Sequence, residues 1–161
     1  MTLISDLLPA SNVKLGIRAG DKKALFEQVA AMLSSTVAVN PSQILSSLVA
    51  RERLGSTALG QGIAIPHGRV KGLRDATGVF MRTDAPMEFE SPDGKPVSLI
   101  FALLVPERAT DVHLQILSEL AQMFSDKEVR QKLSQAADEQ EARQIIIGWD
   151  PHATDQRRPA V

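Results

Sequence analysis

The chain has 161 residues and a net charge of −1, and it is 43% hydrophobic and 23% charged, which fits one soluble globular domain. The small net charge and an aromatic content of only 4% argue against a nucleic-acid partner. The absence of cysteine excludes disulfides, thiolate catalysis and cysteine-ligated metals. No apolar run is long enough to span a membrane, and the first residues lack the basic segment of a secretory signal. We therefore expect a cytoplasmic protein with no membrane insertion.

The first part of the chain predicts a strand followed by two helices. Apolar residues alternate over residues 13–17, the period of a half-buried strand. Gly20-Asp21 then opens a helix, and residues 40–43 (Asn-Pro-Ser-Gln) open a second with an N-cap, a first-turn proline and a glutamine three residues on. Gly55 ends the second helix. The expected buried faces are Leu25, Val29, Met32 and Leu33 in the first helix and Ile44, Leu45 and Leu48 in the second.

Three strands are predicted in the middle of the chain. The segment of residues 62–65 is short and apolar, and residues 77–82 contain a Val-Phe-Met run. Residues 97–105 (VSLIFALLV) are apolar almost throughout, as expected for a strand covered on both faces. Residues 92–94 (Pro-Asp-Gly) between the last two strands predict a turn.

Three helices are predicted after these strands. The first begins at Thr110 or Asp111 and ends near Phe124, and its apolar residues lie on more than one side, which predicts deep burial. Residues 125–128 (Ser-Asp-Lys-Glu) form a capping box for the next. The last begins near Asp138, and its buried face is Ala142, Ile145 and Ile146. Together these elements predict an α/β single-domain sandwich, a small mixed β-sheet flanked by helices over residues 1–149, and a disordered C-terminal tail over residues 150–161.

A glycine-rich segment surrounds His67, the residue that is the strongest candidate for a chemical role. Five of the ten glycines fall within residues 55–72, but their spacing matches neither of the common nucleotide-binding loops. His67 lies between Pro66, which stiffens the backbone, and Gly68, which leaves the imidazole uncrowded. A neutral imidazole is a good nucleophile near neutral pH. The alternative is a histidine with only a structural role in a loop.

Two further residues are weaker candidates. His113 falls in the first turn of a predicted helix, where the helix dipole favours an anion, although its position alone favours a capping or packing role. Arg51 falls in the last turn of a helix, where a cation is favoured in any case, and its planar guanidinium also suits phosphate oxygens. Arg69 is a lesser candidate. The hydroxyls of residues 56–57 suit an anion or a turn, and His152 in the tail is taken as incidental.

The segment ERLGSTALGQGIAIPHGR resembles the signature of the enzyme IIA domains of the fructose–mannitol class in the bacterial sugar phosphotransferase system, most of all the nitrogen-regulatory type. The segments ISDLLPASNV, VSLIFALLVPE and DVHLQILSELAQMFSD are also similar, so the resemblance covers roughly residues 3–148. One departure is Gln61, where the family usually has Asn.

This resemblance implies a phosphocarrier function, with a tele-phosphohistidine intermediate on His67 and supporting roles for His113 and Arg51. The phosphoryl donor would be an HPr-like protein charged from phosphoenolpyruvate by enzyme I. Regulatory partners would then distinguish the phosphorylated form from the unphosphorylated form. No cofactor and no metal are expected. We expect a phosphotransferase-type protein that acts mainly as a regulatory phosphocarrier.

Three alternatives remain open. A sugar-specific enzyme IIA would pass phosphate to a separate IIB protein, and the lack of IIB and IIC domains in this chain favours regulation over that role. A small metallohydrolase using His67 and His113 is weakly supported, because no HExxH or comparable ligand spacing occurs. The third alternative is a binding module that does not transfer phosphoryl groups.

Overall fold

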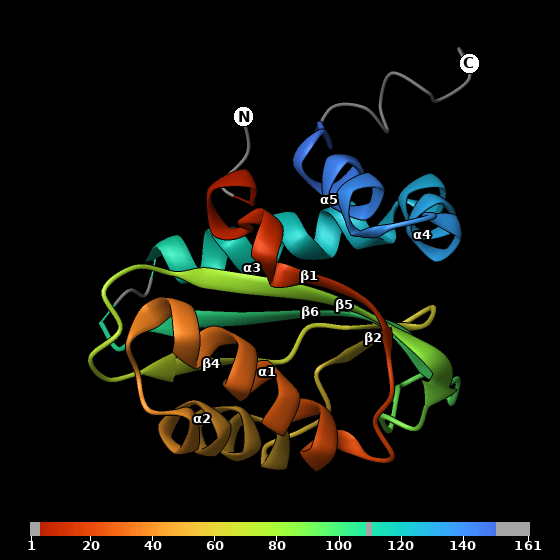
Figure 1. The fold of residues 1–161 in the computed structure, drawn as a ribbon. Helices are drawn as coiled ribbons and strands as arrows, with labels where there is room; N and C mark the ends of the chain where they lie inside the picture. Colours follow the sequence, from red (N-terminus) through yellow and green to blue (C-terminus); the bar gives the residue numbers. More distant parts are fainter. Residues whose placement is uncertain (1–3, 109–110, 151–161) are drawn as a thin grey trace.

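The computed structural model describes residues 4–108 and 111–150, in which six strands form one mixed sheet between two layers of helices (Figure 1). The order is β1-β5-β6-β3-β2, and β4 also pairs with β6. The strands are β1 (Val13–Ile17), β2 (Ala58–Gly60), β3 (Ile63–Ala64), β4 (His67–Val70), β5 (Thr77–Met87) and β6 (Val97–Pro106). The predicted α/β sandwich with a small mixed sheet is confirmed.

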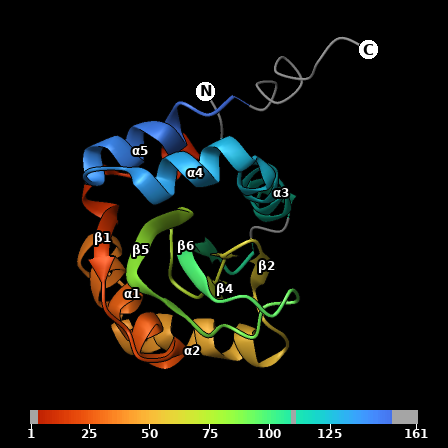
Figure 2. The same ribbon diagram turned by 90° about the vertical axis from the view of Figure 1, so that its right-hand side faces the viewer.

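Helices cover both faces of this sheet (Figures 1 and 2). One face carries α1 (Lys22–Val37) and α2 (Pro41–Arg53), and the other carries α3 (Asp111–Ser125), α4 (Lys127–Gln135) and α5 (Glu139–Ile147). Two 3-10 helices, η1 (Ser5–Leu7) and η2 (Ala10–Asn12), precede β1. Within the described residues, no helix is long and apolar enough to cross a membrane.

Strand β6 separates the two hydrophobic cores, as its apolar sequence predicts. Phe101 and Leu103 pack with α3, α4 and α5, whereas Ile100 and Ala102 pack with α1 and α2. All four side chains are fully buried. Because successive side chains of a strand point to opposite faces, this one continuous apolar segment contributes alternate residues to the two cores.

The predicted starts of three helices are confirmed by side-chain caps. Asp21 accepts from the N–H of Ala24 before α1, Asn40 accepts from the N–H of Ser42 before α2, and Asp138 accepts from the N–H of Glu141 before α5. Gln43 differs from its expected capping role, because its side chain donates to the carbonyl of Lys71 at 2.8 Å. It links α2 to the loop after β4.

Two expectations for the C-terminal helices are wrong. Ser125 does not cap α4, since its hydroxyl donates to the Gln122 carbonyl inside α3, and Asp126 caps α4 instead by accepting from the N–H of Glu128. Helix α3 is not buried on all sides either. Val112 is 50% exposed and Leu114 is 66% exposed, so part of its apolar surface faces solvent.

The glycine-rich segment is more ordered than its sequence suggests. It contains β2 and β4, which were not predicted, and His67 begins β4 and does not lie in a loop. Strands of three and four residues carry too few side chains for a visible period, and their partners lie elsewhere in the chain. Of the predicted tail, Asp150 is exposed and has no regular structure, and residues 151–161 lie outside the described residues.

Candidate functional site

The long edge of β6 accepts two short strands in succession, and the break between them places His67. Strand β3 pairs with β6 at Leu99 and Ile100, and β4 pairs with it from Leu103 to Pro106. Between these two stretches the carbonyl of Pro66 accepts a hydrogen bond from the N–H of Leu103 at 2.8 Å. His67 is therefore anchored on both sides by sheet hydrogen bonds.

Alternation along β4 decides which way His67 points. Gly68 and Val70 are buried toward α2, so His67 and Arg69 project from the opposite face of the sheet, which α3 covers. A Cβ atom on Gly68 would overlap the hydroxyl oxygen of Ser47 on α2. The glycine thus permits close packing between β4 and α2, which corrects the expectation that its role is to leave the imidazole uncrowded.

The orientation of the His67 ring is set by the backbone. Its Nδ1 lies 2.7 Å from the carbonyl oxygen of Ile65. Because a carbonyl only accepts, Nδ1 carries the proton of the neutral ring and the lone pair is on Nε2. Burial lowers the pKa of His67 below its ordinary value, and the Arg51 guanidinium lowers it further against the opposing effects of the Ile65 carbonyl and the Glu52 carboxylate. The ring is therefore neutral and nucleophilic at neutral pH.

The fold brings the second predicted histidine against the first. The ring centroids of His67 and His113 are 5.8 Å apart and the rings are inclined at 74°, an edge-to-face arrangement. His113 lies in the first turn of α3 and is only 8% exposed. Burial lowers its pKa, and the nearby His67 and Arg69 lower it further. Its buried Nε2 has no hydrogen-bond partner among the described residues.

Arg51 lies near enough to His67 for its charge to lower the pKa of that ring. One of its N–H groups donates to the Gly55 carbonyl at 2.8 Å, which closes the turn after α2. The hydroxyls of Ser56 and Thr57 are engaged elsewhere, on the Phe89 carbonyl and on the carboxylate of Glu52. They therefore make turn contacts and are not free for an anion. His152 lies outside the described residues.

Sequence reasoning missed one charged residue at this site. The side chain of Glu52 is 8% exposed and contacts both Lys22 and Thr57. A signal was available, because Glu52 falls in the last turn of α2, where the helix dipole disfavours an anion. A carboxylate at this unfavourable position indicates that a particular side chain or backbone group stabilises it.

The site combines a neutral imidazole nucleophile, a second imidazole and an arginine, which together suit transfer of an anionic phosphoryl group. No group of three or more histidine, cysteine or acidic side chains that could hold a metal occurs in residues 4–108 and 111–150. Exposed large apolar side chains lie close to these residues in the chain: Leu54 and Leu59 after Arg51, and Val112 and Leu114 beside His113.

Comparisons with known proteins cover nearly the whole chain. A family model described as phosphoenolpyruvate-dependent sugar phosphotransferase system, EIIA 2, matches residues 6–148. The nitrogen regulatory protein of Pseudomonas aeruginosa is 38% identical over 148 residues, which is 91% of this chain and 96% of that protein. The nitrogen regulatory protein of Bradyrhizobium diazoefficiens is 36% identical over 143 residues, covering 89% and 94%. The crystal structure of nitrogen regulatory protein IIA-Ntr from Neisseria meningitidis superimposes with a TM-score of 0.86 at 49% identity, covering 90% of this chain and 99% of that one.

Proposed function

Because the chain belongs to the EIIA 2 family of the phosphoenolpyruvate-dependent sugar phosphotransferase system, we propose that it is a cytoplasmic phosphocarrier that accepts a phosphoryl group on Nε2 of His67 and acts mainly as a regulatory switch. The observation that carries the proposal is the hydrogen bond from Nδ1 of His67 to the Ile65 carbonyl. It leaves Nε2 as the nucleophile and predicts the tele-phosphohistidine isomer. The similarity to nitrogen regulatory proteins supports the regulatory part.

The proposed reaction is an exchange between two imidazoles. The lone pair on Nε2 of His67 attacks the phosphorus in line, a new P–N bond forms, and the P–N bond to the donor's histidine breaks. The donor nitrogen keeps the electron pair of the broken bond. Because both nitrogens have similar basicity, the transfer is reversible. His113, through its unpartnered Nε2 when that nitrogen carries the ring proton, and Arg51 stabilise the phosphoryl oxygens in the transition state.

The donor in this proposal is an HPr-like protein that docks over His67. Docking requires an apolar contact surface, and four exposed side chains near the site in the chain supply it: Leu54, Leu59, Val112 and Leu114. The most exposed is Leu54, at 84%. Leu54 and Leu59 follow α2, whereas Val112 and Leu114 are in the first turn of α3. A docked donor would therefore contact elements from both sides of the sheet.

The switch follows from the charge that phosphorylation adds. A phosphoryl group contributes roughly two negative charges at the place where the neutral His67 ring lies. A partner that packs against the neutral ring then faces a desolvation cost and, if it is acidic, repulsion. Coupling of about 1–3 kcal/mol, or about 5–150-fold in affinity, is the usual size of such an effect.

The direct test is phosphorylation with purified components. The chain is incubated with enzyme I, an HPr-type carrier and phosphoenolpyruvate, and acid-labile phosphate is mapped by mass spectrometry at neutral pH. We expect one phosphate on His67 in the wild type and none in a folded His67→Ala variant. Full acid-labile phosphate in that variant would overturn the assignment.

The regulatory role is tested separately from the chemistry. Partners captured from a cytoplasmic extract by the phosphorylated and unphosphorylated forms should differ. If the only activity that depends on the phosphate is its transfer to a IIB protein, with sugar phosphate as the final product, the chain is the sugar-transport component instead.

A further inference from the structure

The buried carboxylate of Glu52 makes several polar contacts next to the candidate site. Its Oε1 lies 2.9 Å from the ammonium of Lys22, and its Oε2 accepts the hydroxyl of Thr57 at 2.7 Å. The N–H of Thr57 lies 3.1 and 3.3 Å from the two carboxylate oxygens. The carboxylate therefore joins the first residue of α1 to the residue that precedes β2.

These contacts continue by hydrogen bonds to the His67 ring. The carbonyl of Thr57 accepts from the N–H of Ile65 at 3.0 Å, and the carbonyl of Ile65 accepts from Nδ1 of His67 at 2.7 Å. The path thus runs from Lys22 through Glu52, Thr57 and Ile65 to His67. The bond to Thr57 anchors Ile65 through its N–H, and the carbonyl of the same residue fixes the tautomer of the ring.

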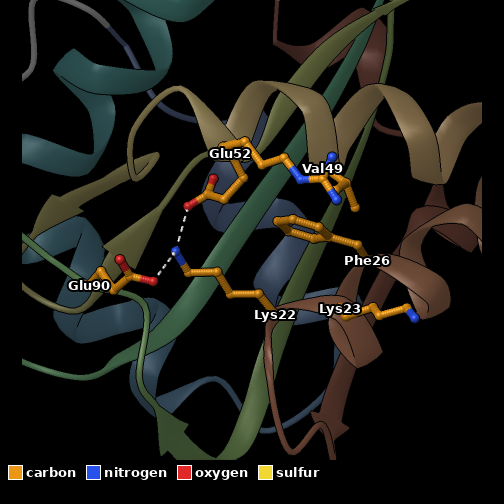
Figure 3. Close-up of a pocket in the computed structure, with 7 residues that line it drawn as sticks. Lys22, Lys23, Phe26, Val49, Glu52 and Glu90 are labelled. Atoms are coloured by element: carbon orange, nitrogen blue, oxygen red, sulfur yellow. Dashed lines mark hydrogen bonds and ion pairs between the residues drawn. The ribbon is translucent and has the colours of Figure 1, made fainter.

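Both charges of the Lys22–Glu52 pair lie at unfavourable helix ends. Lys22 is the first residue of α1, where the dipole disfavours a cation, and Glu52 is in the last turn of α2, where it disfavours an anion. Each charge is acceptable there because the other neutralises it. The pair lines one side of a cavity of about 450 Å³, and Glu90 reaches Lys22 from its rim at 3.4 Å (Figure 3).

We propose that Glu52 is a positioning residue for phosphoryl transfer: it holds Thr57, and through Thr57 and Ile65 it keeps the His67 ring in the tautomer that presents Nε2. The proposal rests on the phosphocarrier function proposed above. The hydrogen bonds of Glu52 go to Lys22 and Thr57, so by hydrogen bonding it reaches the His67 ring only through other residues. Its charge also raises the pKa of His67, which partly offsets the effect of Arg51.

The test compares Glu52→Gln with Glu90→Gln. Both substitutions remove a carboxylate that contacts Lys22, but only Glu52 contacts Thr57. The tautomer of His67 is measured from the ¹⁵N shifts of its ring nitrogens, and the rate of phosphoryl uptake is measured in a single turnover. In folded Glu52→Gln we expect a mixture of tautomers and uptake slowed by about tenfold to a hundredfold, the size of effect known for residues that orient metal-ligating histidines. Glu90→Gln should match the wild type in both.

A folded Glu52→Gln variant with the wild-type tautomer and rate would overturn the proposal. If that variant does not fold, Thr57→Val decides, because it removes only the hydroxyl that donates to Glu52. A shift in tautomer supports the proposal and an unchanged tautomer with an unchanged rate overturns it. The ¹⁵N measurement needs no phosphoryl donor. Failure of the wild type to take up phosphate would therefore reject the proposed function and still leave the positioning role of Glu52 to be decided by the tautomer.

Discussion

A main-chain oxygen decides which nitrogen of the His67 ring carries the proton, whereas many functional histidines are oriented by a carboxylate. A main-chain acceptor carries no full charge, so it orients the ring without strongly stabilising its protonated form. The pKa of His67 is consequently lowered by burial, and the ring stays neutral. A neutral acceptor with a free Nε2 is the state that phosphoryl uptake requires.

We predict that His113→Ala and Arg51→Ala each slow phosphoryl transfer to His67 without unfolding the protein. Loss of one preorganised donor to a developing oxyanion commonly costs about 10²–10³ in rate, and we expect about tenfold to a hundredfold here because water replaces part of the contact. Single-turnover uptake from the phosphorylated carrier measures this effect. Arg53→Ala is the matched control for Arg51, since Arg53 is exposed in the same helical turn. Wild-type rates in both test variants would assign these residues to structure alone.

We predict that the free energy of unfolding falls on mild acidification because of the partly buried His67 and the buried His113. Burial lowers the pKa of both His67 and His113 below the ordinary 6.5. The unfolded chain then binds protons that the folded chain does not, so the free energy of unfolding decreases as the pH drops from 6.5 toward the lowered values. Urea unfolding at about pH 7.5 and about pH 5.5 measures the decrease. His113→Gln should show a smaller decrease, and an equal one would contradict the assignment.

The turn between β2 and β3 gives a physical reason for the Asn that the family resemblance implies at position 61. Gln61 has φ of 59°, in the left-handed region that Asn tolerates better than other non-glycine residues. Its N–H donates to Asp93 at 2.9 Å, and this hydrogen bond is the main cause that lowers the pKa of Asp93 to about 2. The backbone shape and the N–H of residue 61 therefore matter here, and the described contacts assign no role to its amide side chain.

We predict that Gln61→Asn raises the free energy of unfolding by up to about 1 kcal/mol, since it relieves part of the left-handed strain. Gln61→Ala is the control, because alanine keeps the N–H and remains strained, and it should change stability by less than about 0.5 kcal/mol. Urea unfolding of the three proteins gives the comparison. An equal gain in both variants would show that the backbone conformation is not the cause.

The proposed donor-docking surface would draw on both helical layers, because Leu54 follows α2 and Leu114 lies in α3. Both side chains are largely exposed, at 84% and 66%. In the free protein this exposure costs free energy, since apolar surface stays in water. Coverage by a protein partner recovers that free energy.

We predict that Leu114→Asp slows transfer from the phosphorylated carrier protein by about tenfold, equivalent to about 1.4 kcal/mol of lost contact. Phosphorylation by a small donor such as phosphoramidate should stay at the wild-type rate, because that reagent needs no docking surface. Both rates are measured on the same preparation. Equal slowing with both donors would mean that the substitution disturbs His67 and His113 themselves.

The sequence alone determined the features that depend on near neighbours in the chain. Side chains such as Asp21, Asn40 and Asp138 begin helices by bonding to backbone two or three residues ahead, so their effect is visible in a short window. Strand β6 was visible because an uninterrupted apolar run fits a strand buried on both faces. The motif around His67 likewise singled out the candidate phosphoryl acceptor, because the residues that form the motif are contiguous in the chain.

Only the tertiary structure decided the features that depend on distant partners. Strand β4 exists because β6 supplies its hydrogen bonds, and four residues without a partner carry no strand signal of their own. The contact between His67 and His113 requires β4 and α3 to meet across one face of the sheet. The proton on Nδ1 depends on the direction of the Ile65 carbonyl, and Ile65 is itself anchored to Thr57 through its N–H. The first two contacts join segments far apart in the chain and the third depends on how the backbone bends after β3, and residue type and spacing do not encode this geometry.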